Sequence, residues 1–165
     1  MKVFGVIGWK NSGKTTLMER LVAEITARGL TVSTIKHAHH GVDVDQPGRD
    51  TYRHRQAGAQ QVILSSPVRV AVMSELRGAP EPGLEDLLQR LAPVDLVLVE
   101  GFKREGHNKI EAHRGATGQP LIALDDSTVR AVASDTAENL TYDGRLFDLN
   151  DIAAIADFVQ AKAGL

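Results

Sequence analysis

The stretch GWKNSGKTT, residues 8–16, fits the pattern G-x-x-x-x-G-K-[ST] of a loop that wraps the phosphates of a nucleotide. It follows the apolar run KVFGVIG at 2–8 and opens a segment, residues 14–28, with apolar residues at helical spacing. A strand, a glycine-rich turn and a helix in that order direct backbone N–H groups and the helix dipole at a phosphate. The stretch therefore predicts a nucleoside triphosphate site near the N-terminal end of the chain.

Three side chains supply the expected chemistry of this site. The Lys14 ammonium should reach the β- and γ-phosphates, and the Thr15 hydroxyl should bind Mg²⁺. The run DLVLVEG at 95–101 ends in Glu100, which should lie at the carboxyl edge of a sheet, where open α/β sheets bind ligands. We expect Glu100 to reach the metal through water or to polarise the attacking water, so Lys14 and Glu100 are the candidate catalytic residues.

Composition limits the other possibilities. The chain has 165 residues, 42% hydrophobic and 24% charged, which is an ordinary soluble mixture and suits one domain over 1–165. A formal net charge of −2 predicts no nonspecific attraction to nucleic acid or to an anionic membrane. There is no cysteine, and no apolar run approaches the roughly 20 residues that span a bilayer. A cytoplasmic protein is expected.

The remaining segments alternate between strand and helix patterns. The β-branched run TVSTIKH at 31–37 predicts a strand, and 60–66 with 68–76 predicts a central β-hairpin around Ser66-Pro67. Other expected elements are a short helix over 51–59 capped by Asp50, a helix over 81–93, strands at 109–114, 120–124 and 129–135, and a last helix over 150–162 capped by Asn150. The fold class is α/β, a mostly parallel sheet with helices on both faces.

The segment KHAHHGVDVDQPGRDTYRHR, residues 36–55, admits three interpretations. It follows a strand beside the expected γ-phosphate position, which favours a switch-like or substrate loop, and Asp43 and Asp45 could then approach Mg²⁺. Its histidines suggest a transition-metal site, although His37, His39 and His40 lack the spacing of a helical zinc pair. The third interpretation is a solvated loop without a ligand.

Together, GWKNSGKTT, residues 35–59 and DLVLVEGFK resemble the MobB family of molybdopterin guanine dinucleotide biosynthesis proteins. The matching pattern combines the P-loop, a K-H-x-H-H-x-x-D-x-D-x-x-G-x-D-[ST]-[WY] segment and a V-E-G-F-K strand end. The similarity continues through AVASD at 131–135 and into the C-terminal helix, so it covers nearly the whole chain.

The resemblance implies a P-loop protein that binds GTP with Mg²⁺, hydrolyses it slowly at most, and forms a homodimer, for which the hairpin at 61–76 is a candidate element. It also implies an adaptor for the guanylyltransferase that attaches GMP to molybdopterin, with the molybdenum-insertion protein and molybdopterin as further candidate partners. Thr15, Glu100 and Asp45 are the candidate metal ligands. The candidate nucleotide-binding residues are Gly8, Asn11, Ser12, Gly13, Lys14, Thr15, Thr16, Lys36, His37 and Asp135. Asp135 is included because the chain has no N-K-x-D segment to read guanine, and it is the nearest late acidic residue after a strand.

Two other functions compete with the adaptor. A small-molecule kinase would need an arginine-rich lid, for which Arg49, Arg53 and Arg55 are candidates. A GTP-dependent metallochaperone would need a metal site built on His37, His39 or His40, without the cysteine that such proteins usually use.

Overall fold

Two compact units make up the chain, one of residues 1–37 and 87–165 and one of residues 38–86. The structure is a computed structural model that describes residues 1–38 and 41–165. His39 and His40, two of the histidines considered for a metal site, lie outside the described residues. The expectation of one domain over 1–165 stays a prediction.

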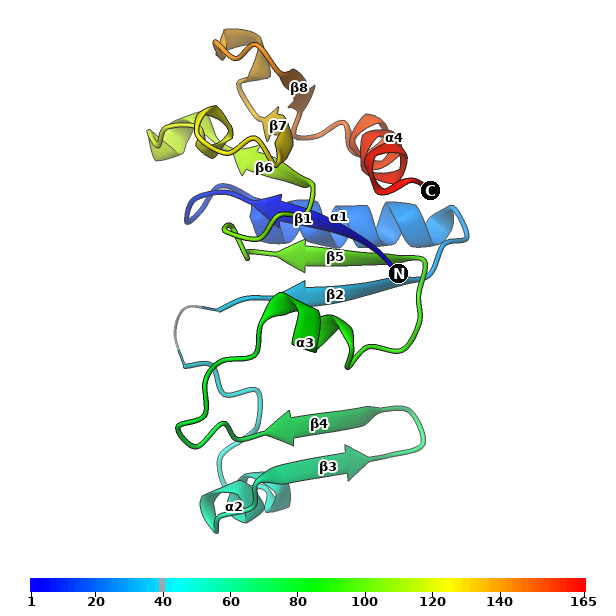
Figure 1. The fold of residues 1–165 in the computed structure, drawn as a ribbon, viewed down its shortest axis with the longest axis vertical. Helices are drawn as coiled ribbons and strands as arrows, with labels where there is room; N and C mark the ends of the chain where they lie inside the picture. Colours follow the sequence, from blue (N-terminus) through cyan, green and yellow to red (C-terminus); the bar gives the residue numbers. More distant parts are fainter. Residues whose placement is uncertain (39–40) are drawn as a thin grey trace. The chain divides into compact units, whose positions relative to one another are not determined.

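A six-stranded parallel sheet forms the first unit. Its strands are β1 (Lys2–Ile7), β2 (Val32–Lys36), β5 (Leu96–Glu100), β6 (Lys109–His113), β7 (Val129–Ser134) and β8 (Arg145–Asp148). They are ordered β2-β5-β1-β6-β7-β8, and each neighbouring pair is parallel (Figure 1). This arrangement confirms the mostly parallel α/β fold. Because all strands run the same way, their carboxyl ends share one edge, with β1 between β5 and β6.

Two helices, α1 (Lys14–Ala27) and α4 (Ile152–Ala163), pack on this sheet and on one another. The apolar stripe of α1, with Leu17, Leu21 and Ile25, is buried against residues of β1 and β5 such as Phe4 and Leu98. Each such side chain stabilises the fold by about 1.5–3 kcal/mol when fully buried. The helix that follows the phosphate loop is therefore held rigidly against the central strands.

The segment that packs beside Glu111 of β6 differs from the sequence prediction. Residues 120–124 were expected as a strand, but they contain a 3₁₀ turn, η2 (Ile122–Leu124). The cause is the fully buried Glu111 of β6, whose two carboxylate oxygens accept hydrogen bonds from the backbone N–H groups of Ile122 (3.0 Å) and Ala123 (2.9 Å). Burial raises the pKa of Glu111, and the two backbone bonds oppose that rise.

Element ends also differ from the sequence prediction. The helix expected over 81–93 is the shorter α3 (Leu84–Leu88), because i→i−3 bonds replace helical ones at Arg90 and Leu91. Asn150 is not the cap of α4. Its side-chain oxygen accepts a bond from Arg20, and Asp151 caps the helix by accepting from Ala154 N. Strand β8 was not predicted, and two further 3₁₀ turns are η1 (Gly115–Thr117) and η3 (Ala137–Asn139).

The second unit contains α2 (Asp50–Gln56) and the antiparallel strands β3 (Gln61–Ser65) and β4 (Val70–Ser74). The expected hairpin is therefore confirmed. Asp50, expected as the cap of the short helix, is its first residue, with Arg49 at the cap position.

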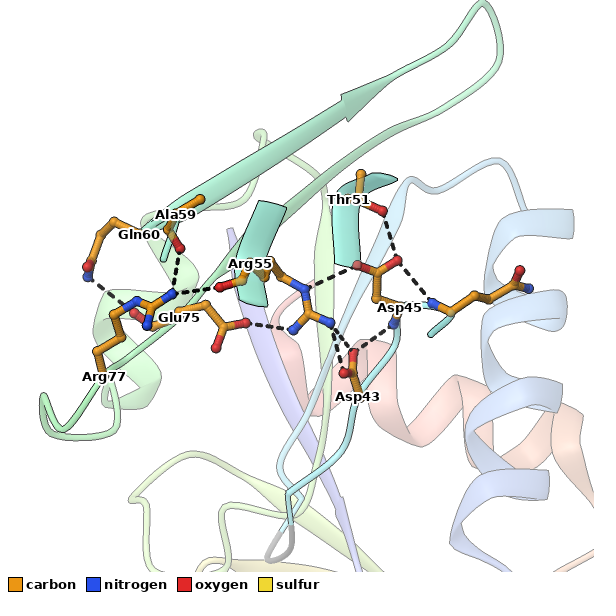
Figure 2. Close-up of polar contacts among 9 residues, drawn as sticks. Asp43, Asp45, Thr51, Arg55, Ala59, Gln60, Glu75 and Arg77 are labelled. Atoms are coloured by element: carbon orange, nitrogen blue, oxygen red, sulfur yellow. Dashed lines mark hydrogen bonds and ion pairs between the residues drawn. The ribbon is translucent and has the colours of Figure 1, made fainter. Parts of the chain in front are cut away.

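Arg55 of α2 holds this unit together through three carboxylates (Figure 2). Its guanidinium donates to Asp43 at 2.8 Å, to Asp45 at 3.1 Å and to Glu75, after β4, at 2.6 Å. The Arg55 side chain is only 9% exposed, and its bond holds the pKa of Asp43 below the usual range. Arg77 then donates to the Arg55 carbonyl, so loop, helix and hairpin share one network.

Replacing Arg55 by Met should loosen the second unit while leaving the first folded. Methionine keeps an apolar stem but removes the donors that join the loop, helix and hairpin. We expect several-fold faster proteolytic cleavage within 38–86, mapped by mass spectrometry, because local opening becomes easier. Arg53→Met, an exposed position on the same helix, is the matched control. Equal cleavage rates in the two variants would show that the network contributes nothing to local stability.

Candidate nucleotide-binding site

Residues 8–16 join β1 to α1 through a loop with left-handed backbone at Gly8 (φ 148°), Asn11 (φ 65°) and Gly13 (φ 92°). Gly8 cannot carry a side chain, because a Cβ there would lie 2.4 Å from the carbonyl oxygen of Ala112 and 2.4 Å from Ser12 Oγ. Turns with positive φ gather successive N–H groups into a concavity that binds anions. The loop is thus shaped by backbone constraints to receive a phosphate.

Lys14 begins α1 and lies across this loop. Its ammonium donates to the carbonyl oxygen of Trp9 at 2.6 Å. Burial lowers the pKa of Lys14; Glu100 opposes that effect, while Lys103 and Lys36 add to it. A phosphate group would supply the negative charge that this crowded cation lacks.

Glu100 closes β5 beside the loop. Parallel pairing places it next to Val6 of β1 on one side and Lys36 of β2 on the other. Its carboxylate lies 3.3 Å from the Lys36 ammonium, and the residue is 9% exposed. A cavity of about 450 Å³ is lined by Glu100, by Arg114 and by the loop residues Lys10, Asn11, Ser12, Gly13, Lys14, Thr15 and Thr16. Lys14, Thr15 and Glu100 are therefore brought together.

The turn after Glu100 contacts both the phosphate loop and the residue that follows β2. Gly101 (φ 94°) and Phe102 (φ 50°) are both left-handed, and a Cβ at Gly101 would lie 3.1 Å from the Cβ of His37. The Phe102 ring stacks on the His37 imidazole with centroids 4.5 Å apart. Lys103 Nζ lies 4.4 Å from the centroid of the Trp9 ring. His37 thus contacts the turn that borders the loop.

Sequence reasoning missed Trp9 and Arg114. Both line a second cavity of about 650 Å³, together with Lys10, Asn11, Ala116, Thr117 and Gln119. The P-loop pattern leaves position 9 unspecified, and Arg114 follows β6, whose place beside β1 is not visible in the sequence. An aromatic residue inside the loop was the available signal for Trp9.

Two of the expected ligands have other hydrogen-bond partners in the structure. Asp45 belongs to the second unit, where it accepts bonds from Thr51 and Arg55, and its metal role stays a prediction. Asp135 follows β7 and accepts a bond from Gly115 N at 2.9 Å. Neither of the two cavities described above has Asp135 in its lining, and its contact with a base stays a prediction.

The oxygen donors of the first cavity suit magnesium, which prefers hydroxyl, carboxylate and phosphate ligands over imidazole. Thr15 and Glu100 supply a hydroxyl and a carboxylate there.

Among residues 1–38 and 41–165, no group of three or more His, Cys, Asp or Glu side chains is arranged to hold a metal ion. In the same part of the chain, no helix is long and apolar enough to cross a membrane.

A parallel sheet with a phosphate-binding loop after its central strand, and an acidic strand end beside that loop, defines a P-loop NTPase fold. The model of the MobB family, molybdopterin guanine dinucleotide synthesis protein B, matches residues 3–135. The chain belongs to this family.

Known proteins support this membership. The molybdopterin-guanine dinucleotide biosynthesis adapter protein of Escherichia coli K12 is 46% identical, over 92% of this chain and 87% of that protein. The protein of the same name from Haemophilus influenzae is 44% identical, over 96% of this chain and 87% of its own length. The crystal structure of a MobB homologue from Bacillus stearothermophilus has a TM-score of 0.70 and 29% identity, with 99% of each chain covered.

Proposed function

We propose that this protein is a GTP-binding adaptor in the synthesis of molybdopterin guanine dinucleotide, assisting the guanylyltransferase that attaches GMP to molybdopterin. The family and the adapter names of its relatives support the pathway. The observation that carries the nucleotide-binding part is the cavity that collects the loop backbone, Lys14, Thr15 and Glu100. The molybdenum-insertion protein, molybdopterin and a cytoplasmic location stay predictions.

Each residue of the cavity has a role in this proposal. The loop N–H groups hold the β-phosphate, and Lys14 bridges the β- and γ-phosphates. Thr15 and Glu100 would hold Mg²⁺, which neutralises phosphate charge when it is bound. Glu100 would also orient a water molecule at the γ-phosphate, but the Lys36 ammonium, 3.3 Å from its carboxylate, competes for it. Hydrolysis should therefore be slow without a partner.

Two of the three candidate lid arginines of the kinase alternative are engaged within the second unit. Arg55 is engaged by Asp43, Asp45 and Glu75, and Arg49 donates to Gln46. A lid arginine must be available to close on phosphates. The adaptor proposal requires no such residue.

Removing the charge of Lys14 should abolish most nucleotide binding. We expect Lys14→Ala to weaken Mg·GTP binding about 10- to 100-fold, as for the loss of a charge-assisted hydrogen bond of about 1.5–3 kcal/mol.

Glu100→Gln should retain binding and slow hydrolysis at least about tenfold. Isothermal titration calorimetry measures the affinities, phosphate release measures the turnover, and Lys162→Ala on α4 is the matched control.

Unchanged GTP affinity in Lys14→Ala would refute the phosphate assignment. Tighter binding of Mg·ATP than of Mg·GTP by the natural chain would refute the guanine preference and favour the kinase. Unchanged turnover in Glu100→Gln would leave Glu100 as a structural strand end only.

The hairpin supports the proposal that the protein is a homodimer. One face of the β3–β4 sheet exposes a cross-strand pair, Ile63 (61% exposed) with Val72 (56%), and the nearby Val70 (63%). An isolated two-stranded sheet with an apolar outer face is marginally stable in water, and its unpaired edges invite another strand. A second copy of this face would cover it.

Introducing a charge on that face should dissociate the dimer. We expect Ile63→Glu to raise the dimer dissociation constant more than about tenfold, because a carboxylate would be buried in an apolar contact. Sedimentation equilibrium measures this change, with Gln89→Glu, at an exposed position outside the hairpin, as the control for added charge. A natural chain that sediments as a monomer at micromolar concentration would contradict the proposal.

A further inference from the structure

We propose that the second cavity, bordered by Trp9, Arg114, Thr117 and Gln119, holds the base and ribose of the nucleotide whose phosphates occupy the first. The inference rests on the proposed nucleotide binding and assigns the part of the site that determines specificity. In this proposal Asp135 positions the wall of the cavity and does not contact the base.

The two cavities adjoin one another. Lys10, Asn11 and Arg114 line both, so one ligand bound in the two cavities would contact the same three residues along its length. The second cavity, at about 650 Å³, lies within the range of about 300–1,000 Å³ typical of small-molecule sites. It has room for a nucleoside.

The order of the strands indicates which end of the nucleotide lies on which side of β1. Glu100 ends β5 on one side of β1, and Arg114 follows β6 on the other side. The γ-phosphate and metal belong at the side of Thr15 and Glu100. In this proposal the triphosphate extends from that side along the loop toward Arg114, which also lines the second cavity.

The side chains that border the second cavity suit a base. Trp9 offers an aromatic ring, which stacks on any base. Its orientation is fixed, because Nε1 donates to the Pro120 carbonyl at 2.8 Å. Gln119, Thr117 and Asn11 carry neutral groups that both donate and accept hydrogen bonds. No carboxylate is among the described residues that line this cavity, so an amide, Gln119, is the candidate for reading the base edge.

Two buried or anchored carboxylates hold the wall of the cavity in place. Glu111 accepts bonds from Ile122 N and Ala123 N, just after Pro120, whose carbonyl accepts from Trp9. Asp135 accepts the bond from Gly115 N, at the start of the same segment. Residues 115–123 are therefore fastened at both ends. Asp135 is a positioning residue for Thr117 and Gln119.

The test compares Mg·GTP with inorganic tripolyphosphate, which presents the phosphates without a nucleoside. The natural chain should bind GTP at least about tenfold more tightly than tripolyphosphate in calorimetric titrations. Gln119→Ala should weaken GTP about 5- to 20-fold, the usual effect of one lost hydrogen bond at a binding site, and leave tripolyphosphate within twofold. Gln89→Ala, another exposed glutamine, is the control.

Two further readouts separate base reading from positioning. Trp9 is the only tryptophan, so its fluorescence should change with GTP and not with tripolyphosphate. Asp135→Asn keeps an oxygen that can accept from Gly115 and should change GTP affinity less than threefold, whereas Asp135→Ala should weaken GTP and spare tripolyphosphate.

The outcomes distinguish the two proposals. If neither GTP nor tripolyphosphate binds, the proposed nucleotide binding fails. If both bind through Lys14 but with equal affinity, or if Gln119→Ala leaves GTP affinity unchanged, nucleotide binding stands and the nucleoside assignment is overturned. A loss of GTP binding in Asp135→Asn as large as in Asp135→Ala would return Asp135 to the role of base contact.

Discussion

The parallel pairing of β1 with β5 on one side and β6 on the other is the constraint on which the rest of the first unit depends. It places the carboxyl ends of three strands at one edge and sets the phosphate loop between Glu100 and Arg114. The pairing is stabilised by the apolar side chains of α1 and α4, which are buried against β1 and β5. The loop can then adopt left-handed turns at Gly8 and Gly13 because its two ends are held rigidly.

Charge at this edge is unbalanced in favour of an anion. Lys36 and Lys103 act on Lys14 together with burial to depress its pKa, and Glu100 opposes them. Arg114 adds another positive charge to the lining of the same cavity. A bound triphosphate would relieve this repulsion and gain the backbone N–H groups as donors. The second unit shows the opposite balance: Arg55 is surrounded by Asp43, Asp45 and Glu75. The cationic cluster at the sheet edge is suited to bind an anion. The cluster around Arg55 is already neutralised by its own carboxylates.

The sequence predicted those parts of the fold and site that are local. The P-loop, its helix, and Glu100 at the end of an apolar strand follow from short patterns, and so does the hairpin. Trp9 and Arg114 could not be assigned, because their meeting depends on β6 lying beside β1. The strand expected over 120–124 failed for a similar reason: Glu111, more than ten residues away in the chain, binds its backbone. Asn150 lost its capping role to Asp151 because Arg20 contacts its side chain.

Hydrogen–deuterium exchange of the natural chain, with and without saturating Mg·GTP, would show where the nucleotide binds. Binding at the loop should slow exchange in residues 8–16, at the turn 100–103 and in the segment 114–119, because these form the two cavities. Exchange in β8 and in the outer turns of α4 should not change. If GTP binds but leaves the exchange of residues 8–16 unaltered, the phosphates lie elsewhere and the account is wrong.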